Sequence, residues 1–378
     1  MSDASDEWAR WEAMTGFRRR VREYAEKHRI ALTVTPEEYL AQKQGELARK
    51  LEGKNLIYLD TKHWVNLCRV VVHSPQFLPI YDEILGLLRL LRRKDCICCP
   101  VSSPLFEELM KQTDRATRLA TAKMMDELSG GVCVRSWLDL VQFEFAKHVH
   151  RTLRGGDVEA GAFPAWTKAG FWAGDHTVGF PELSMDDNAL MEKVHIDLRW
   201  EMTFEECQSI PEWIPTPDMF TVAWVQESNQ VKACQTESKL SFNKLVRQRR
   251  RQLFAALKDP FVLMLPALCR GLPGSPAEHV ATILDPIYEG RNPNALPFLE
   301  IVAGLDAAIA LESTRKVQVN DMLDYLHAAQ ALPYCDALFC DNYMAQKMRN
   351  KPLEFGRIFD TEVGSRPEEI ACYLKRLA

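Results

Sequence analysis

The chain has 378 residues, a hydrophobic share of 47%, a charged share of 26% and a formal net charge of −5 at pH 7. These values are ordinary for a globular protein, and the negative charge argues against a protein that coats nucleic acid over its whole surface. No apolar run is long enough for a membrane span, and the acidic N-terminus lacks the core of a signal peptide. The 11 cysteines show no paired zinc-binding spacing. We therefore expect a cytoplasmic protein with free thiols, without a membrane partner and with several domains or one large insertion.

Residues 1–53 are predicted to form a polar, helical N-terminal extension. Trp8, Trp11, Met14 and Phe17 recur at helical spacing, and a run of arginines follows them. Such a stripe is typical of a helix that packs against the body of a protein. Contact of the arginines with nucleic acid is the alternative interpretation.

The first strong strand signal is the apolar run 56–59, which is typical of a strand buried on both faces. The run stops at Asp60, and a helix is expected to begin at Thr61. A carboxylate at the end of a central strand is costly to bury unless it is paired or binds a metal ion. Lys62 and His63 follow directly, either as helix-surface residues or as contacts to a phosphate.

A second buried strand is predicted over 96–101. Ser102 or Ser103 then caps a helix that carries Glu107 and Glu108. Glutamates in the first turns of a helix are common because they interact favourably with the helix dipole. The other elements expected before residue 137 are a helix over 81–94 and a strand over 132–134.

The sequence pattern changes at about residue 137, and residues 137–317 are predicted to be mostly helical. An irregular loop rich in Gly, Trp and Phe is expected over 155–181. The helix predicted over 241–257 combines several arginines with two phenylalanines. This basic helix could hold a phosphate backbone, or it could present a solvated face beside acidic neighbours.

The C-terminal part contains a helix, a turn and a short strand with four acids between residues 319 and 341. Asp321 can cap the helix, Asp324 lies one turn later, Asp336 lies in the turn and Asp341 ends the strand. Taken locally, each acid has an ordinary role as a cap or turn residue. A strand over 355–359 and a terminal helix over 366–377 are expected to follow.

Acids from distant parts of the chain occupy matching positions in this predicted sheet. Asp60, Glu107 or Glu108, Asp324 and Asp341 would meet at the carboxyl edge of parallel strands. Clustered carboxylates repel one another unless a cation neutralises them, and oxygen ligands favour Mg²⁺ or Mn²⁺. Such ions activate water and stabilise the leaving oxygen of a phosphodiester. The chain has no Gly-rich phosphate loop, which argues against an NTPase.

The arrangement resembles the PIN-domain nuclease family. The residues that carry the resemblance are Ile57-Tyr58-Leu59-Asp60-Thr61, the segment 102–109 and the segment 324–341, in the family's order. The resemblance implies an α/β, PIN-like three-layer fold with a central parallel sheet. It divides the chain into an N-terminal helical extension (1–53), a PIN-like nuclease domain (54–136 and 318–378) and a helical insertion (137–317).

The resemblance assigns site residues by position. Asp60, Glu108, Asp324 and Asp341 are the implied catalytic residues and ligands of Mg²⁺ or Mn²⁺, and Asp321 is either a further ligand or a cap. Three features of the sequence bear on this assignment. Glu107 competes with Glu108, although the family's Glu-Leu pattern favours Glu108. Cys340 stands where the family often has Thr or Ser, and His327 either supports a carboxylate or is a buried core histidine.

The resemblance implies an endoribonuclease that acts as a toxin or an antiviral defence effector, with RNA as the substrate and DNA not excluded. The insertion and the N-terminal helices would select the substrate or bind a protein partner or inhibitor. One alternative is a catalytically inactive scaffold that binds nucleic acid or protein. Another is a metal-dependent phosphohydrolase that acts on small phosphoesters.

Overall fold

A parallel sheet of four short strands forms the centre of the computed structural model. Its strands are β1 (Asn55–Leu59), β2 (Ile97–Cys98), β5 (Ala337–Phe339) and β6 (Glu362–Gly364), in the order β2-β1-β5-β6. The predicted α/β class with a parallel sheet is confirmed. The structure describes residues 17–29, 34–155, 165–175, 179, 182–210, 224–230, 232–233, 241–272, 274–289, 295–312 and 316–378.

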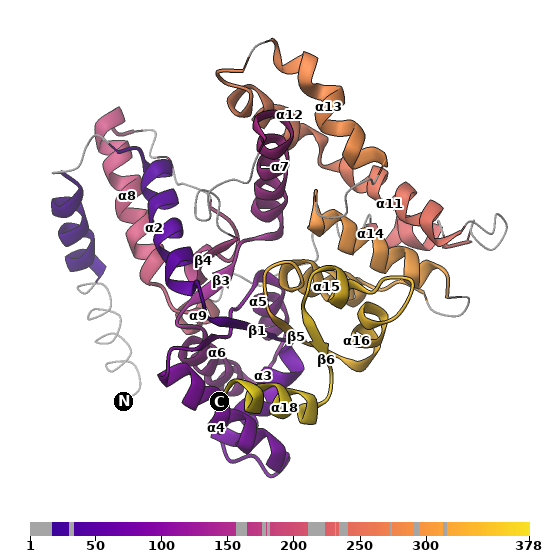
Figure 1. Cartoon of the computed structure of the whole chain (residues 1–378). Coiled ribbons are helices and arrows are strands. Elements are labelled where there is room, and N and C mark those ends of the chain that lie inside the picture. Colours follow the sequence, from indigo (N-terminus) through magenta and orange to yellow (C-terminus); the bar gives the residue numbers. More distant parts are fainter. Residues whose placement is uncertain are drawn as a thin grey trace.

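Helices cover the sheet from both sides (Figure 1). Ile57, Tyr58 and Leu59 are fully buried, as expected for a strand covered on both faces. The helices drawn below the sheet in Figure 1 are α3 (Thr61–Val71), α4 (Pro79–Arg93) and α18 (Pro367–Leu377), and those above it are α5 (Ser103–Met110) and α15 (Val319–Ala331). α6 (Arg115–Ser129) packs against α3, and α16 (Asn342–Arg349) packs against β6.

The register of the sheet brings the ends of two strands together. Leu59 is paired with Phe339, and the Asp60 N–H donates to the Phe339 carbonyl at 2.9 Å. Cys340 N–H in turn donates to the Gly364 carbonyl at 3.0 Å. Because parallel strands end at the same edge, the residues that follow β1 and β5 lie side by side.

A second, two-stranded sheet stands beside the first. β3 (Val132–Val134) pairs antiparallel with β4 (Trp166–Lys168). Val101, shortly after β2, forms one parallel bridge with Cys133 of β3. The strand expected over 132–134 is therefore present. The prediction of an irregular loop over 155–181 was wrong at β4, while 156–164, 176–178 and 180–181 lie outside the described residues. Trp166 is buried against the body of the protein, which gives this short strand a reason to pair.

Helices dominate the described part of the insertion. α14 (Pro297–Ala310) packs against the sheet helix α15 on one side and against α11 (Phe242–Ala256) on the other. The insertion therefore supports the helix that carries Asp324 and His327. Its other described helical segments are α7 (Trp137–Arg154), η1 (Ala169–Phe171), α8 (Met185–Glu201), α9 (Phe204–Ser209), 224–230, α12 (Lys258–Leu268) and α13 (Pro276–Glu289).

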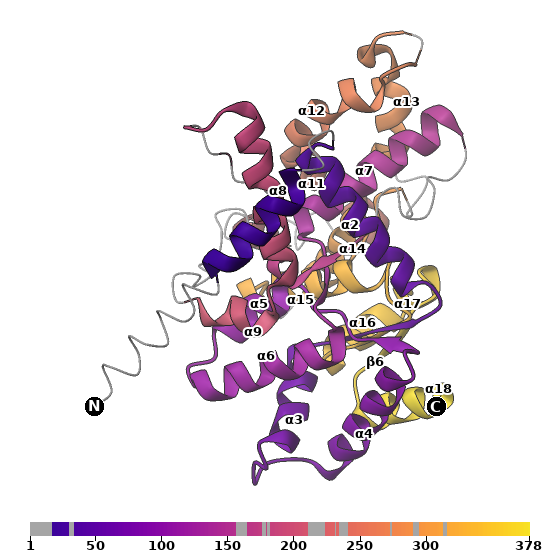
Figure 2. The ribbon, with the colours of Figure 1, turned by 90° about the vertical axis from the view of Figure 1, so that its left-hand side faces the viewer.

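The N-terminal extension is held against the insertion. α2 (Pro36–Leu51) lies beside α8 in both views, and a helix over 17–29 precedes it (Figures 1 and 2). Asp197 of α8 accepts hydrogen bonds from Lys27 and from Tyr39, at 2.9 and 2.8 Å. The predicted stripe from Trp8 to Met14 lies outside the described residues, and Phe17 at its end is exposed.

The basic helix α11 uses two arginines inside the protein. Arg249 is fully buried and pairs with Asp306 of α14 at 2.5 Å. Arg250 pairs with Glu300 of the same helix. These two side chains attach α11 to α14 and pair with acids there, so they are not available to the phosphate backbone that was one of the two interpretations of this helix.

One predicted strand is a helix. Residues 355–359 were expected to form a strand, but α17 (Phe355–Ile358) occupies the segment and β6 follows it. The buried Phe355 ring packs onto Gly304 of α14, where an added Cβ would lie 2.7 Å from the ring. Phe355 is one of the apolar residues that suggested a strand, but its side chain is buried by this contact with another helix.

Two expectations about the whole chain concern membranes and thiols. Among the described residues, none of the helices has both the length and the apolar character needed to span a bilayer. The cysteines that the structure describes are all free, and most of them are buried.

Candidate metal centre

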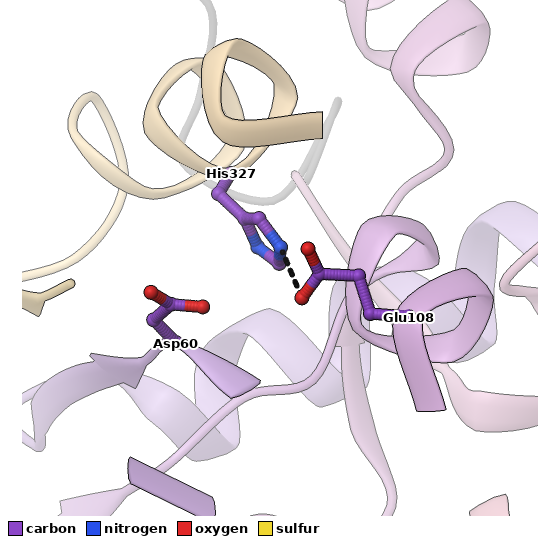
Figure 3. Close-up of side chains that lie close together, drawn as sticks. All are labelled: Asp60, Glu108 and His327. Atoms are coloured by element: carbon purple, nitrogen blue, oxygen red, sulfur yellow. Dashed lines mark ion pairs between the residues drawn. The ribbon is translucent and has the colours of Figure 1, made fainter. Parts of the chain in front are cut away.

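Three side chains from separate elements meet at the carboxyl edge of the sheet. Asp60 follows β1, Glu108 lies on α5 and His327 lies on α15. One ligand atom from each falls within 4.8 Å of the others, and Figure 3 shows the side chains pointing toward one another. The group joins residues that are far apart in the sequence.

Asp60 provides a buried carboxylate in this group. Its residue is 9% exposed. Burial raises the pKa of Asp60, and the carboxylates of Glu108 and Asp341 raise it further, against the lowering effect of His327. Asp60 therefore lies among negative charges, and a bound cation would reduce the repulsion between them.

Glu108 is the glutamate that faces the group, which decides between Glu107 and Glu108. Thr61 Oγ1 donates a hydrogen bond to Glu108 Oε2, and His327 Nε2 lies 3.2 Å from the same oxygen. Burial opposes ionisation, but His327 and Thr61 outweigh it and lower the pKa of Glu108 to about 2. The carboxylate is ionised at neutral pH.

His327 belongs to the group itself. The residue is 3% exposed, and its Nδ1 lies 2.6 Å from the Tyr58 hydroxyl. Its Nε2 forms an ion pair with Glu108 Oε2 at 3.2 Å and has no further partner among the described residues. Burial lowers the pKa of His327, but Glu108 and the neighbouring acids raise it to about 9. Its position one helical turn after Asp324 is the sequence signal that placed it near the carboxylates.

Asp324 and Asp341 lie close to this group but outside it. Burial raises the pKa of Asp324 to about 7, and the charges of Asp341, Asp60 and Glu108 contribute. Asp341 caps α16, where its Oδ1 accepts from Tyr343 N–H at 2.7 Å. The four acids predicted from the sequence thus share one electrostatic neighbourhood, and Asp341 also has its ordinary local role.

The two optional acids of the C-terminal segment have structural roles. Asp321 Oδ2 accepts from the Gln318 N–H at 2.7 Å in a capping box at the start of α15. Asp336 Oδ2 accepts from the Leu56 N–H at 2.7 Å, near the start of β1 and β5. In the described part of the chain, neither acid belongs to the close group of ligand atoms.

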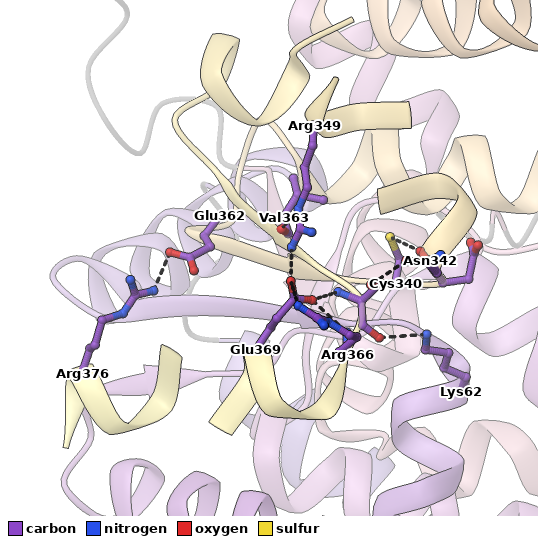
Figure 4. Close-up of polar contacts among 11 residues, drawn as sticks. Lys62, Cys340, Asn342, Arg349, Glu362, Val363, Arg366, Glu369 and Arg376 are labelled. Carbon is purple, nitrogen blue, oxygen red and sulfur yellow. Dashed lines mark hydrogen bonds and ion pairs between the residues drawn. The ribbon is translucent and has the colours of Figure 1, made fainter. Parts of the chain in front are cut away.

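The two residues after Thr61 also support the fold. Lys62 Nζ donates to the Ser365 carbonyl at 3.1 Å, and Figure 4 shows this lysine reaching toward the turn that follows β6. His63 is fully buried, and its Nδ1 lies 2.8 Å from the Tyr81 hydroxyl. Burial lowers the pKa of His63 to about 3, so its ring is neutral at physiological pH.

Comparison of the chain with protein-family models, with curated proteins and with solved structures finds no match. The resemblance to PIN-domain nucleases therefore depends on the motifs quoted above. The chemistry of the site follows from the side chains that the fold brings together.

The donor set fits a divalent cation. Asp60 and Glu108 offer carboxylate oxygens, and His327 offers a buried ring nitrogen that, among the described residues, contacts only Glu108. Carboxylates suit Mg²⁺ and Mn²⁺, and an imidazole suits transition-metal ions once the ion takes the place of the Nε2 proton that faces Glu108. A bound ion would also neutralise the repulsion that raises the pKa of Asp60 and Asp324.

Proposed function

We propose that the protein is a divalent-metal-dependent endoribonuclease with a PIN-like fold. The observation that carries this proposal is the approach of Asp60, Glu108 and His327 ligand atoms to within 4.8 Å at the edge of the parallel sheet. Alongside burial, the negative charges of Asp341, Asp60 and Glu108 all raise the pKa of Asp324, so Asp324 and Asp341 lie in the same electrostatic field as the close group. This convergence supports one shared centre over separate local roles.

The residues would divide the work as follows. Asp60 and Glu108 would hold Mg²⁺ or Mn²⁺, which supplies an activated water and charge stabilisation for phosphodiester hydrolysis. Thr61 would keep Glu108 oriented through its hydrogen bond to Oε2. Asp324 and Asp341, on α15 and at the start of α16, would orient water and the substrate phosphate at the same edge.

The experiment is cleavage of RNA by the purified full-length protein with Mn²⁺ or Mg²⁺. Asp60→Asn combined with Asp341→Asn should lower the rate by at least about 100-fold, because metal charge stabilisation contributes several kcal/mol. Asp336→Asn is the matched control, since this acid bonds the Leu56 N–H outside the centre. Cleavage by the double variant at the wild-type rate would contradict the mechanism. Single-stranded DNA in the same assay decides between the two nucleic acids.

The cellular role follows from the activity. Cleavage of cytoplasmic RNA would arrest growth, as expected for a toxin or an antiviral defence effector. The helical insertion packs against α15 through α14, so a protein partner or inhibitor that binds the insertion would act next to the centre. Induced expression of the wild type and of the double variant should separate growth arrest from mere overproduction.

An inactive scaffold is the second candidate, and one residue favours it. Cys340 is 5% exposed, and its Sγ donates to the Asp341 carbonyl at 3.5 Å. The family's hydroxyl is thus replaced by a thiol that is engaged with the backbone. Calorimetric titration with Mn²⁺ separates the two functions, because a scaffold should bind no ion in the acidic group.

A further inference from the structure

A buried hydrogen-bond chain holds the imidazole of His327. The Tyr58 hydroxyl lies 2.6 Å from His327 Nδ1 and 2.5 Å from Ser102 Oγ. We propose that Tyr58 is a positioning residue that makes His327 Nε2 a metal ligand, and that the centre therefore prefers Mn²⁺ to Mg²⁺. This inference rests on the proposed metal centre, and it concerns the identity of the ion and the residues that select it.

The strand places Tyr58 directly beneath the site. Side chains two residues apart in extended backbone share a face, and Asp60 follows β1 with extended backbone, so its side chain is expected on the face of Tyr58. Tyr58 and Ser102 are fully buried, and Ser102 caps the helix that carries Glu108. A buried phenol needs a hydrogen-bond partner. One hydroxyl thus links the strand of Asp60, the helix of Glu108 and the ring of His327.

The partners indicate which ring nitrogen is available to an ion. A histidine that binds a metal ion is neutral and donates its other N–H to a neighbouring acceptor. Tyr58 can accept the Nδ1 proton and donate its own proton to Ser102 Oγ. A bound ion would displace the Nε2 proton that Glu108 stabilises in its absence, and Nε2 would then offer its lone pair to the ion. This nitrogen lies in the close group with Asp60 and Glu108 (Figure 3).

A nitrogen ligand changes which ion the centre accepts. Mg²⁺ requires near-ideal octahedral geometry and strongly favours oxygen ligands and water. First-row transition ions accept imidazole together with carboxylates. Of the two ions that suit the acids, Mn²⁺ therefore gains more from His327. Loss of the ring, or of its fixed orientation, should reduce Mn²⁺ binding more than Mg²⁺ binding.

The experiment is calorimetric titration of the full-length protein, without RNA, with Mn²⁺ and with Mg²⁺. The wild type should bind Mn²⁺ more tightly. Tyr58→Phe should weaken Mn²⁺ binding by about 10- to 100-fold, the usual effect of removing a group that orients a metal ligand. His327→Ala should weaken it at least as much, and both changes should bring the two affinities closer. Tyr334→Phe is the matched control, because this hydroxyl bonds Glu144 of α7, and the variant should bind both ions as the wild type does.

Electron paramagnetic resonance of the wild type with Mn²⁺ provides a measurement that needs no variant. Coupling of the bound ion to an imidazole nitrogen is expected, and its loss in His327→Ala assigns that nitrogen. Mn²⁺ binding without nitrogen coupling, or unchanged by Tyr58→Phe and His327→Ala, would overturn the inference. In that case, metal-dependent RNA cleavage would still support the proposed function. Nitrogen coupling without RNA cleavage would contradict the nuclease and leave this inference supported, whereas absence of any bound ion would overturn both.

Discussion

Glu144 shows how a single buried acid joins the insertion to the site helix. Its carboxyl oxygens accept from the Phe298 N–H at the start of α14, at 3.2 and 3.0 Å, and Oε1 accepts from the Tyr334 hydroxyl. Phe298 belongs to the insertion, and Tyr334 lies between α15 and β5. Burial raises the pKa of Glu144 from its ordinary 4.5 to about 8, against the lowering effect of these hydrogen bonds. The folded protein therefore keeps this group protonated at neutral pH.

The raised pKa predicts a pH dependence of stability. Between pH 4.5 and about 8 the folded state binds a proton at Glu144 that the unfolded state has released. The stability that this group contributes is thus present below pH 4.5 and is lost as the pH rises through 8. Each pKa unit corresponds to about 1.4 kcal/mol. Between acidic and alkaline pH, the unfolding free energy of the wild type should therefore fall by on the order of a few kcal/mol more than that of Glu144→Gln. Urea denaturation at both ends of this range measures it, and parallel pH profiles for the two proteins would contradict the assignment.

At the scale of elements, the edge of the sheet depends on close packing between β5 and β6. A Cβ added at Gly364 would lie 2.4 Å from the Phe339 ring. The Gly364 carbonyl also accepts from the Cys340 N–H, next to Asp341. The glycine is thus required by a close approach between neighbouring strands at the end where the centre lies.

Gly364→Ala should therefore destabilise the protein by about 1–3 kcal/mol, the usual cost of overpacking a tight core position. Gly86→Ala is the control, because this helical glycine of α4 has open space around it. That change should be neutral or stabilising by up to about 1 kcal/mol, since alanine favours the helix. Chemical denaturation of both variants tests the contrast, and equal stability of the two would show that β5 and β6 tolerate separation.

The sequence predicted the elements whose signals are local. β1 and the helix–turn–strand from α15 to β5 were predicted because apolar runs and turn residues define them directly. α17 was predicted as a strand because the packing of Phe355 onto Gly304 has no local signature. The burial of Arg249 was not predicted for the same reason, since its partner Asp306 comes from another helix.

At the scale of the whole molecule, strand order assembles the candidate centre. The approach of Asp60 to Glu108, with Asp324 and Asp341 in the same electrostatic neighbourhood, was predictable, because parallel strands bring their carboxyl ends to one edge. The part played by His327 was not, because the direction of its Nε2 depends on Tyr58 and its partner Ser102. Only the folded arrangement of β1, α5 and α15 fixes that direction.

The most direct test of the central claim is a crystal structure of the full-length protein grown with Mn²⁺, with anomalous scattering recorded at the manganese absorption edge. A bound ion should appear among Asp60, Glu108 and His327, at about 2.1–2.3 Å from their ligand atoms. Soaking out the metal with a chelator should remove the anomalous peak and leave the sheet intact. An ordered Mn²⁺ elsewhere, with no peak among these three side chains, would contradict the account.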